Sequence, residues 1–598
     1  MRGTMGVRGS VMTRDRRSGL MWWGRVVLPL VGVLSLLLTA CGQQSGAPPL
    51  AKDQKFVWPF VTSNGSLDLS GEEFDPSQIS SATDFTTASL IYSGLVTIDA
   101  NLRVAKDLAK SIDIDATGKT YTFHLLSNMT FSDGKPIKAQ DFAYSIDRAL
   151  DPSRNGVGLT YLGHILGASD RYAGKIPTII ANGNNANAGL NVVDDQTLVI
   201  HLDQPVGFFL EALTYPTAYV VEKSLIDQYP GGKWVQHLDQ GGCSGPFKVK
   251  SYGGGKQLSF VPNPGWGAAT HRTITLAQID RPYVDSVDNE YKNYRTGQYD
   301  YTDVPDRDYA YARGQDDYRE VGELAINYFA FNFTKAPFDS LEVRQAFDLA
   351  LNKQLLVDRI VNGGGIPTNH IVPQGMPGYN PKLTTPPADG TQSLTGNQDA
   401  ALQLLAKAKG NCKGDTFTDP DYCPFISGSS LQPIVIVANS SNATRVDLTK
   451  AAADAWSSVL GLNVQEQTVT FKDIITAILG PATDNPYQGW ALGWLADYPD
   501  PQDWLTLQFA STAPYDSSGV NDANLDSLLA KADVEQDPNK RMQLYNQAEQ
   551  QVVNLVGWLP YMQAKAKWRQ RSWVHGFGLN PQGSIPDIAW PNVYITAH

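Results

Sequence analysis

Alternation of apolar and polar residues predicts β-strands in several parts of the chain. In 120–126 (TYTFHLL), Tyr121, Phe123 and Leu125 take every second position, and 197–202 (TLVIHL) alternates in the same way. Successive side chains of a strand point to opposite faces, so each pattern forms one apolar face that can pack on a core. Both segments are therefore predicted to be half-buried strands.

Apolar residues at three- and four-residue spacing predict two long helices. The first covers 340–361, follows Asp339 or Ser340 as N-cap and stops before the glycines at 363–365. Its apolar positions include Val343, Ala346, Phe347, Ala350 and Leu351. The second starts at Asp537-Pro538, and its apolar positions are Tyr545, Ala548, Val552, Leu555 and Val556. Strands and helices mixed in this way indicate an α/β or α+β protein.

A proline-containing stretch follows the apolar segment 487–492, which itself predicts a strand that runs into a loop. The stretch GWLADYPDP covers 493–501 and places Asp497 beside Trp494 and Tyr498. Its two prolines cannot donate backbone hydrogen bonds, which argues against a helix interior or a central strand. Two interpretations fit this carboxylate: an ordinary turn covered by aromatic side chains, or a binding site for a positively charged group.

Chain length and loops indicate several domains. Residues 182–189 (NGNNANAG) and 363–396, which are rich in turn-forming residues, predict surface excursions and candidate boundaries. At 598 residues the chain exceeds one ordinary core, so about two to four domains or lobes are expected. Hydrophobic residues make up 42% and charged residues 18%, which is typical of a well-packed globular protein.

The first forty residues have the pattern of a secretion signal. Arg14, Arg16, Arg17 and Arg25 form a basic region, and the apolar run VVLPLVGVLSLLLTA follows at 26–40. This run is too short and too soon interrupted for a comfortable membrane span. A basic region followed by a short apolar run predicts a signal peptide.

The residue after this run predicts a lipid anchor. The sequence LTACG at 38–42 resembles a bacterial lipobox, in which the cysteine receives a diacylglycerol and cleavage falls just before it. The alternative is an ordinary signal peptide with a chance cysteine. On the lipobox interpretation, 1–40 is a lipoprotein signal peptide and 41–50 is a flexible tether. The mature protein is then extracytoplasmic and held on the outer face of the bacterial cell membrane through lipidated Cys41.

The net charge excludes a nucleic-acid partner. The chain carries −12, and because residues 1–40 hold six Arg and one Asp, their removal leaves −17. Such an acidic surface repels the phosphate backbone, and no basic run follows to compensate for it.

Three cysteines follow Cys41 in the sequence, and their expected states depend on the compartment. An extracytoplasmic compartment permits disulfides. Cys412 and Cys423 bracket a short polar loop and are expected to pair. Cys243 then remains as an odd thiol, which we interpret as a small packed residue rather than a nucleophile.

No catalytic or metal-binding motif stands out in the sequence. The eight histidines form no cluster of metal-ligand spacing. GGGK at 253–256 lacks the leading glycine and the Ser or Thr of a phosphate-binding loop, and GCSG at 242–245 is not a nucleophile elbow. Carboxylates are plentiful, but spacing singles out no pair. We therefore expect no metal, no cofactor and no enzymatic activity.

Five stretches in order resemble the peptide- and nickel-binding components of ABC importers, which are extracytoplasmic solute receptors. Residues 117–150 match the family's signature region, in which an edge strand leads through SDG at 132–134 into a helix. The other four are EEFDPSQIS…LIYSGLVTIDA (72–100), SGPFKV (244–249), NYFAFNFTKAPFDSLEVRQAFDLALNK (327–353) and GWLADYPDP (493–501). Their order and spacing fit the family from about residue 56 to the C-terminus.

The resemblance implies an α/β, periplasmic-binding-protein-like clamp of type II, with three lobes and a discontinuous lobe I. The ligand would be enclosed between lobes I and III. By motif order, lobe I takes 50–97, 236–325 and 566–598, lobe II takes 98–235, and lobe III takes 326–565.

The resemblance also implies a ligand site at GWLADYPDP. In the peptide-binding members, the aspartate at the position of Asp497 pairs with the α-ammonium of the peptide, which compensates a charge that is costly to bury alone. The positions that match the family's ligand contacts are Asp497, Trp494, Gly493, Tyr328, Asn332, Ser80 and Ala82. On the alternative reading, Trp494 is a core residue and Asp497 a capping residue. A cysteine present in some peptide binders is replaced here by Leu495.

The favoured hypothesis is a monomeric, lipid-anchored receptor that captures oligopeptides and delivers them to an ABC permease and ATPase complex. The same scaffold could instead bind a non-peptide ligand, such as a metal chelate, an oligosaccharide or a signal molecule. A secreted hydrolase is the less favoured alternative, because catalytic motifs are missing.

Overall fold

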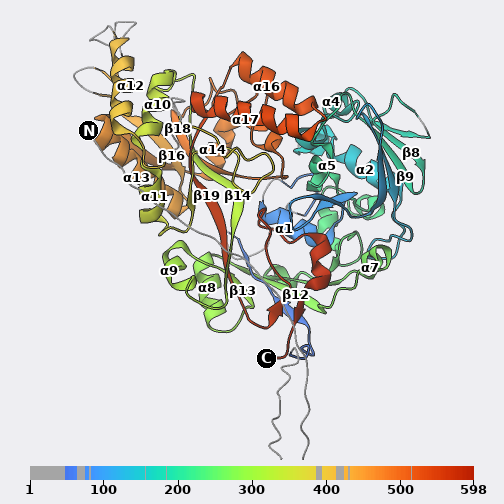
Figure 1. Cartoon of the computed structure of the whole chain (residues 1–598). Coiled ribbons are helices and arrows are strands. Elements are labelled where there is room, and N and C mark those ends of the chain that lie inside the picture. Colours follow the sequence, from blue (N-terminus) through green and yellow to red (C-terminus); the bar gives the residue numbers. More distant parts are fainter. Residues whose placement is uncertain are drawn as a thin grey trace, which may run out of the picture. The chain divides into compact units, whose positions relative to one another are not determined.

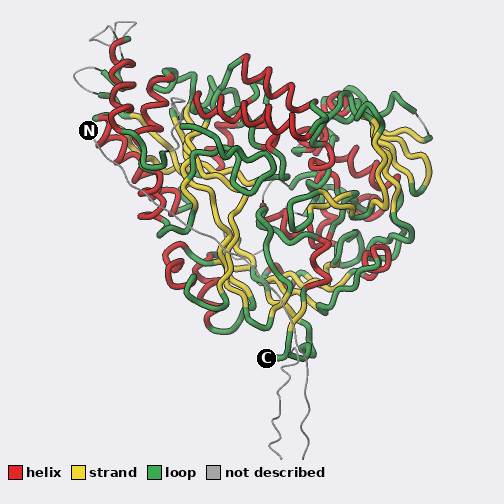
Figure 2. The backbone as a smooth tube through the Cα atoms, viewed as in Figure 1, coloured by secondary structure: helices red, strands yellow, loops and turns green. Residues whose placement is uncertain are grey.

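The computed structural model describes residues 48–62, 74–79, 82–154, 156–183, 185–385, 393–412, 423–427, 431–513 and 515–598. Cys41, the predicted signal peptide, most of the tether and Ser80 lie outside the described residues. Residues Pro49–His598 form one compact unit, and every element named below lies in it. Three main sheets organise this unit, and we name them sheets A, B and C (Figures 1 and 2).

Sheet A joins the start of the described chain to a much later segment. Its order is β1-β12-β11-β10, and β2 also pairs with β12. The strands are β1 (Lys55–Val57), β2 (Phe60–Val61), β10 (Phe247–Ser251), β11 (Gln257–Pro262) and β12 (Gln278–Val284). β1 and β2 pair in parallel with β12, which lies more than two hundred residues later, so this sheet is assembled from separate parts of the sequence.

Sheet B contains the two strands predicted by alternation. Its order is β5-β6-β9-β8-β7. The strands are β5 (Ala109–Ile114), β6 (Thr120–Leu125), β7 (Ile180–Asn182), β8 (Leu190–Asp194) and β9 (Thr197–His201). Tyr121, Phe123 and Leu125 are buried, as their spacing predicts. One expectation is wrong: the strand before SDG at 132–134 is β6, which pairs on both sides and is not an edge strand.

Sheet C is the largest and contributes one wall of the site described below. Its order is β13-β19-β14-β18-β16-β17, and β15 also pairs with β19. The strands are β13 (Tyr301–Asp303), β14 (Tyr318–Phe331), β15 (Ile366–Pro367), β16 (Ile434–Asn439), β17 (Val464–Val469), β18 (Gly489–Leu495) and β19 (Trp558–Gln570). Phe329 and Phe331 belong to one core cluster, whereas Tyr328 and Ala330 belong to another. This period of two shows that sheet C is buried on both faces.

Helices and two small ladders complete the unit. The longer helices are α1 (Ala82–Ile91), α2 (Ala139–Ala149), α7 (Pro264–Thr270), α8 (Val287–Arg295), α10 (Leu341–Ala350), α11 (Lys353–Ile360), α12 (Gln398–Gly410), α13 (Ala443–Leu460), α14 (Phe471–Ile478), α16 (Ala523–Val534) and α17 (Pro538–Leu555). The shorter helices are α3 (Gly158–Leu162), α4 (Ala168–Tyr172), α5 (Phe209–Ala212), α6 (Lys223–Gln228), α9 (Tyr309–Ala312) and α15 (Thr506–Phe509). The ladders are β3 (Val96–Ile98) with β4 (Val104–Lys106), and β20 (Val574–His575) with β21 (Tyr594–Ile595).

The helix predicted at 340–361 is in fact two helices. α10 ends before Leu351, whose backbone is extended, and α11 starts after Asn352. The Asn352 side chain accepts a hydrogen bond from the Leu355 N–H at 2.8 Å, so it acts as an N-cap inside the apolar pattern. The second predicted helix is correct at its start, because Asp537 caps α17, but it ends before Val556, which adopts a left-handed conformation.

The two longest strands of sheet C, β14 and β19, lie side by side over most of their length (Figure 1). β14 passes through the predicted lobe border at 325/326, and β19 passes through the border at 565/566. The chain therefore continues as regular strand across both positions. The division into lobes remains an interpretation drawn from the resemblance.

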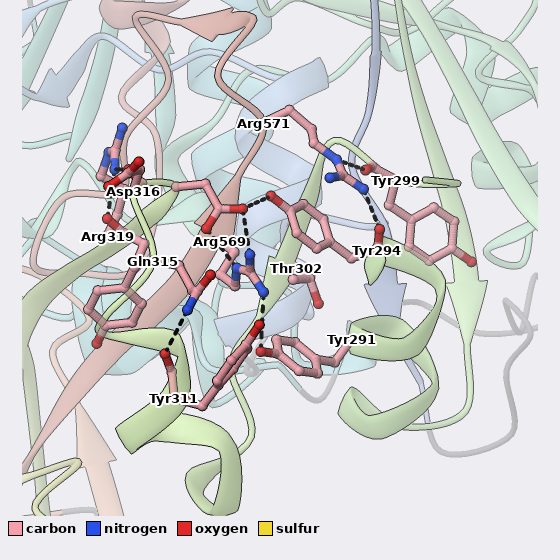
Figure 3. Close-up of polar contacts among 12 residues, drawn as sticks. Tyr291, Tyr294, Tyr299, Thr302, Tyr311, Gln315, Asp316, Arg319, Arg569 and Arg571 are labelled. Atoms are coloured by element: carbon pink, nitrogen blue, oxygen red, sulfur yellow. Dashed lines mark hydrogen bonds and ion pairs between the residues drawn. The ribbon is translucent and has the colours of Figure 1, made fainter. Parts of the chain in front are cut away.

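A polar cluster fixes one end of this strand pair (Figure 3). The Arg569 guanidinium on β19 donates to both carboxylate oxygens of Asp317, at 2.7 and 2.9 Å, and Tyr294 donates to the same carboxylate at 2.7 Å. Arg571 donates to the backbone carbonyls of Tyr294 and Tyr299. These contacts join the end of β19 to helix α8 and to the loop after it.

The three cysteines of the described residues take the states that the sequence predicts. Cys412 and Cys423 form a disulfide. Cys243 is a buried free thiol whose Sγ lies 3.5 Å from the Leu238 carbonyl, and burial raises its pKa to about 11. It is therefore a packed residue with little thiolate character. No helix in the described part of the chain has both the length and the apolar character needed to cross a membrane.

Candidate functional site

A cavity of about 500 Å³ is lined by segments that lie far apart in the sequence. Strand β18 and the residues after it form one wall, from Leu492 to Asp497. Helices α13 and α14 contribute further lining, and Tyr161 and Tyr215 reach it from the part of the chain that contains sheet B. Cavities of this size hold small ligands and are often lined by apolar residues with a few polar groups.

Strand β18 has an open edge along this wall. β14 pairs with β18 from Gly489 to Leu495, whereas β16 pairs with its other edge only at Gly489 and Trp490. In the described part of the chain, no other strand covers the rest of that edge. An open edge offers N–H and C=O groups to an extended ligand.

Asp497 lies at the end of this wall and faces the cavity. Its Oδ2 accepts a hydrogen bond of 2.5 Å from the Tyr161 hydroxyl, which is 336 positions away in sequence. Among the described residues, Asp497 forms no ion pair with a Lys, Arg or His side chain. Burial raises the pKa of the Asp497 carboxyl to about 7, although the hydrogen bond from Tyr161 lowers it. The site thus holds a desolvated carboxyl without a cation.

A second carboxyl, that of Asp503, holds Asp497 and Trp494 in place through hydrogen bonds. Its Oδ2 accepts hydrogen bonds from the Asp497 N–H at 3.1 Å and from the Trp494 Nε1–H at 3.3 Å. Burial, followed by the neighbouring Asp497 carboxylate, raises the pKa of Asp503 well above its ordinary value. Two acids in one desolvated region disfavour a second negative charge, so this pair has a strong need for a cation or a proton.

Aromatic rings enclose the carboxyl of Asp497. Tyr161 stacks on Tyr215 with ring centroids 3.8 Å apart, and Tyr498 packs edge-on against Tyr161 at 6.1 Å. Trp494 lies 5.3 Å from Tyr515, which also lines the cavity. These rings exclude water while their hydroxyl and indole groups supply hydrogen bonds, which is a common use of aromatic residues at binding sites.

Arg445 supplies a positive charge to the same cavity. It lies in the first turn of α13, and its Nη2 donates to the Asn327 side-chain oxygen at 3.0 Å. Its Nε has no partner within the described structure, and Arg445 forms no ion pair there. Gly493 leaves room for this contact, because a Cβ at that position would lie 3.0 Å from Arg445 Nη2 and would require that side chain to shift slightly.

The other predicted contact residues divide between the cavity and the core. Trp494, Gly493 and Tyr328 line the cavity, and Tyr328 is also stacked on Trp558 at 3.7 Å. Asn332 does not line it: the buried amide donates to the Ala482 carbonyl at 2.8 Å and accepts from Thr334. Ala82 begins α1, and its side chain is not described.

The sequence reasoning missed several residues that the fold brings to this site. They are Tyr161, Tyr215, Tyr515, Arg445, Asp503 and the apolar face of α14. Only α14 carried a usable signal, since apolar residues recur at helical spacing around 471–479. Tyr161 and Arg445 stand in unremarkable local sequence and reach the site only through tertiary packing. The described residues include no group of His, Cys, Asp and Glu that could hold a metal ion.

Comparisons with known proteins agree with this architecture. Residues 103–516 match the model of the bacterial extracellular solute-binding proteins, family 5. The periplasmic oligopeptide-binding protein OppA of Salmonella typhimurium is 27% identical over 586 residues, covering 95% of this chain and 98% of that protein. The "Probable deoxycholate-binding periplasmic protein YgiS" of Escherichia coli is also 27% identical, covering 96% and 99%.

Solved structures show the same fold. Haemophilus influenzae OppA in complex with RPPGFSPFR has a TM-score of 0.72 at 22% identity, covering 92% of this chain and 100% of that one. Escherichia coli MppA, a murein tripeptide binding protein, gives the same TM-score, identity and coverage. The fold is therefore the periplasmic-binding-protein clamp that the resemblance implied. Since the family model matches more than half of its length, the chain belongs to the bacterial extracellular solute-binding proteins of family 5.

Proposed function

We propose that this protein captures oligopeptides between the lobes of its clamp and delivers them to an ABC permease and ATPase complex. As a member of a family of binding proteins for transport, the chain is not an enzyme. Oligopeptide-binding relatives that align over nearly the whole chain support the peptide as ligand. We expect the protein to act as a monomer.

The observation that carries the proposal is the pair of uncompensated charges in one cavity. Asp497 lacks a cation and Arg445 lacks a carboxylate among the described residues, yet both line the same space. A buried charge without a counter-charge is costly. A peptide is a zwitterion, so its ammonium group and a carboxylate can satisfy both charges at once.

The open edge of β18 suits the backbone of such a ligand. An extended peptide can add to this edge through N–H and C=O groups that every peptide carries. Binding would then depend on the backbone and on the terminal charges. In this proposal Gly493 and Trp494 contact the bound chain, and Asp497 binds its amino terminus.

The clamp motion would use the strands that cross between lobes. β14 and β19 pass through both predicted borders, and a pair of continuous strands can bend as a hinge while the lobes stay rigid. Closure would place Tyr161, on the sheet B side, against Asp497, and the 2.5 Å hydrogen bond between them supports this part of the proposal. The closed form would be the state that the permease recognises.

We also propose that lipidated Cys41 holds the mature protein on the outer face of the cell membrane. The Cys41→Ser variant should appear in the soluble fraction of cells that express it. The native chain should remain with the membranes and leave them only in detergent. Retention of Cys41→Ser in the membrane fraction would refute the lipid anchor.

Mass spectrometry of co-purified ligand tests the peptide proposal directly. Residues 42–598 would be purified natively and then denatured, and the released molecules would be identified. A series of short peptides is the expected result. A single non-peptide species would refute the proposal and leave the fold unchanged.

The apolar character of the cavity and the similarity to the probable deoxycholate-binding protein favour a second candidate, an apolar organic acid. Its carboxylate could pair with Arg445, but Asp497 would remain without a cation. The same mass-spectrometric measurement separates the two candidates.

A further inference from the structure

Helix α14 shows an apolar face that the protein core covers only in part. Of its residues, only Ile474 is fully buried. Phe471 is 48% exposed and Leu479, which caps the C-terminus, is 55% exposed. Phe471, Ile475, Ile478 and Leu479 follow the spacing of one helix face, and all four line the cavity that contains Asp497. Apolar surface of this kind usually marks a place where something binds.

The helix itself is firmly placed. The Thr470 side chain caps its first turn by accepting from the Asp473 N–H at 3.1 Å. Ile474 packs in the core cluster on one face of sheet C, and Ile478 is packed against it. Phe471, Ile475 and Leu479 belong to none of the core clusters of the described residues. These three side chains are therefore exposed although the helix that carries them is capped and packed on the core.

The register of sheet C shows where this face lies along the ligand wall. Ile436 on β16 pairs with Gly489 on β18, and Asn439, three residues later, pairs with Val469 at the end of β17. α14 thus begins at the level of Leu492, where the open edge of β18 lies. Leu492 lies three residues, about 10 Å of extended backbone, before the end of β18 at Leu495, and Asp497 follows in the loop two residues later.

From this placement we propose that α14 selects oligopeptides carrying a large apolar side chain within their first four residues. The inference rests on the proposed function, because the ligand's amino terminus must bind at Asp497. A peptide extending from Asp497 along the edge of β18 would then pass α14. An apolar side chain on that peptide would cover the exposed face of the helix and gain the free energy of leaving water.

Calorimetric titration of matched free-amino tetrapeptides tests this preference. Tetra-alanine would be compared with peptides carrying a single Leu at each position in turn, and with peptides carrying Ser at the same positions. At one position or more, the Leu peptide should bind about ten- to one-hundredfold more tightly than the Ser peptide, as expected for burial of a Leu side chain.

Two variants assign the preference to the helix. The double variant Phe471→Ser and Ile475→Ser should reduce the Leu-to-Ser ratio to below about threefold. Lys472→Ser is the matched control, since Lys472 is exposed on the same helix but does not line the cavity, and it should keep the native ratio.

The outcomes separate this inference from the proposed function. Equal affinities for Leu and Ser peptides at all four positions would overturn the inference and leave peptide binding intact. So would a double variant that weakens both peptide classes by the same factor, because α14 would then shape the cavity without selecting the side chain. If no free-amino tetrapeptide binds, the inference fails, and the proposed function fails with it only if no peptide co-purifies with residues 42–598.

Discussion

At the scale of single residues, the proposed contact between Asp497 and the ligand depends on the charge state of the Asp497 carboxyl. The carboxyl faces a cavity, is enclosed by tyrosine rings and has Asp503 behind it. Burial raises its pKa to about 7, so near neutral pH the empty site holds a mixture of acid and carboxylate. A cationic ligand favours the carboxylate and therefore competes with a proton.

Asp497→Asn should weaken the binding of free-amino peptides by roughly 3 kcal/mol, a loss of about two orders of magnitude, because the ammonium would lose its only counter-charge. N-acetylated peptides should bind poorly to the native protein. Calorimetry of both peptide forms provides the measurement. Asp484→Asn, which changes an exposed carboxylate, is the control and should have no effect. Equal native affinity for free and acetylated peptides would exclude the ammonium role.

Peptide affinity should also depend on pH through Asp497. Its folded pKa of about 7 means that the carboxylate needed for the ammonium is formed only as pH rises through that value. Affinity should increase by up to about tenfold per unit between pH 5 and 7, and fall again above about pH 8 as the peptide amine loses its proton. Titrations from pH 5 to 9 measure this profile. An acidic limb that persists unchanged in Asp497→Asn would contradict the assignment.

At the scale of elements, the long strands β14 and β19 must be anchored if they are to act as a hinge. Arg569, Asp317 and Tyr294 form this anchor beside helix α8 (Figure 3). Burial raises the pKa of Asp317, but the Arg569 guanidinium outweighs this effect and holds that pKa below its ordinary value. The anchor should therefore remain charged throughout the physiological pH range.

Arg569→Met should lower the free energy of unfolding by about 2 kcal/mol, since it leaves the half-buried Asp317 carboxylate without the two hydrogen bonds that Arg569 donates. Urea denaturation measures the change. Arg319→Met is the matched control: Arg319 is exposed and donates only to backbone carbonyls, so its loss should cost less than about 0.5 kcal/mol. Equal effects of the two substitutions would show that the cluster does not anchor the strands.

At the scale of the whole molecule, several buried acids make stability depend on pH. Burial raises the pKa of six carboxyls to about 6 or 7: Asp107, Glu211, Glu323, Asp497, Asp516 and Asp533. In the unfolded chain these groups titrate near pH 4. The folded protein therefore binds more protons than the unfolded chain between about pH 4 and 7.

It follows that the ligand-free protein should become less stable as pH rises from 5 to 8. A raised folded pKa of an acid stabilises fully below the unfolded pKa, and this contribution is lost as pH rises through the folded value. Thermal unfolding at pH 5, 6, 7 and 8 should show a falling Tm. Glu323→Gln should make the decline shallower. A Tm that rises over this range would contradict the conclusion that burial disfavours the charged forms of these acids.

Much of the local structure could be predicted from the sequence. The strands at 120–126 and 197–202, the start of α17 and the disulfide partners all depend on short-range patterns that the residues themselves carry. The break inside 340–361 was missed, because the apolar spacing continues through Asn352 while its side chain caps a new helix. The inner place of β6 was missed because pairing partners are set by the whole sheet.

For this protein, the sequence by itself determined several of the elements, the family resemblance and the position of Asp497 at the end of a strand. Those features depend on periodicity, turn chemistry and motif order, which are local properties of the chain. Only the tertiary structure brought Tyr161 to Asp497 and Arg445 to Gly493, and turned the apolar face of α14 toward the same cavity. Contacts between residues that are distant in the sequence arise from the packing of sheets and helices, and no short-range pattern encodes them.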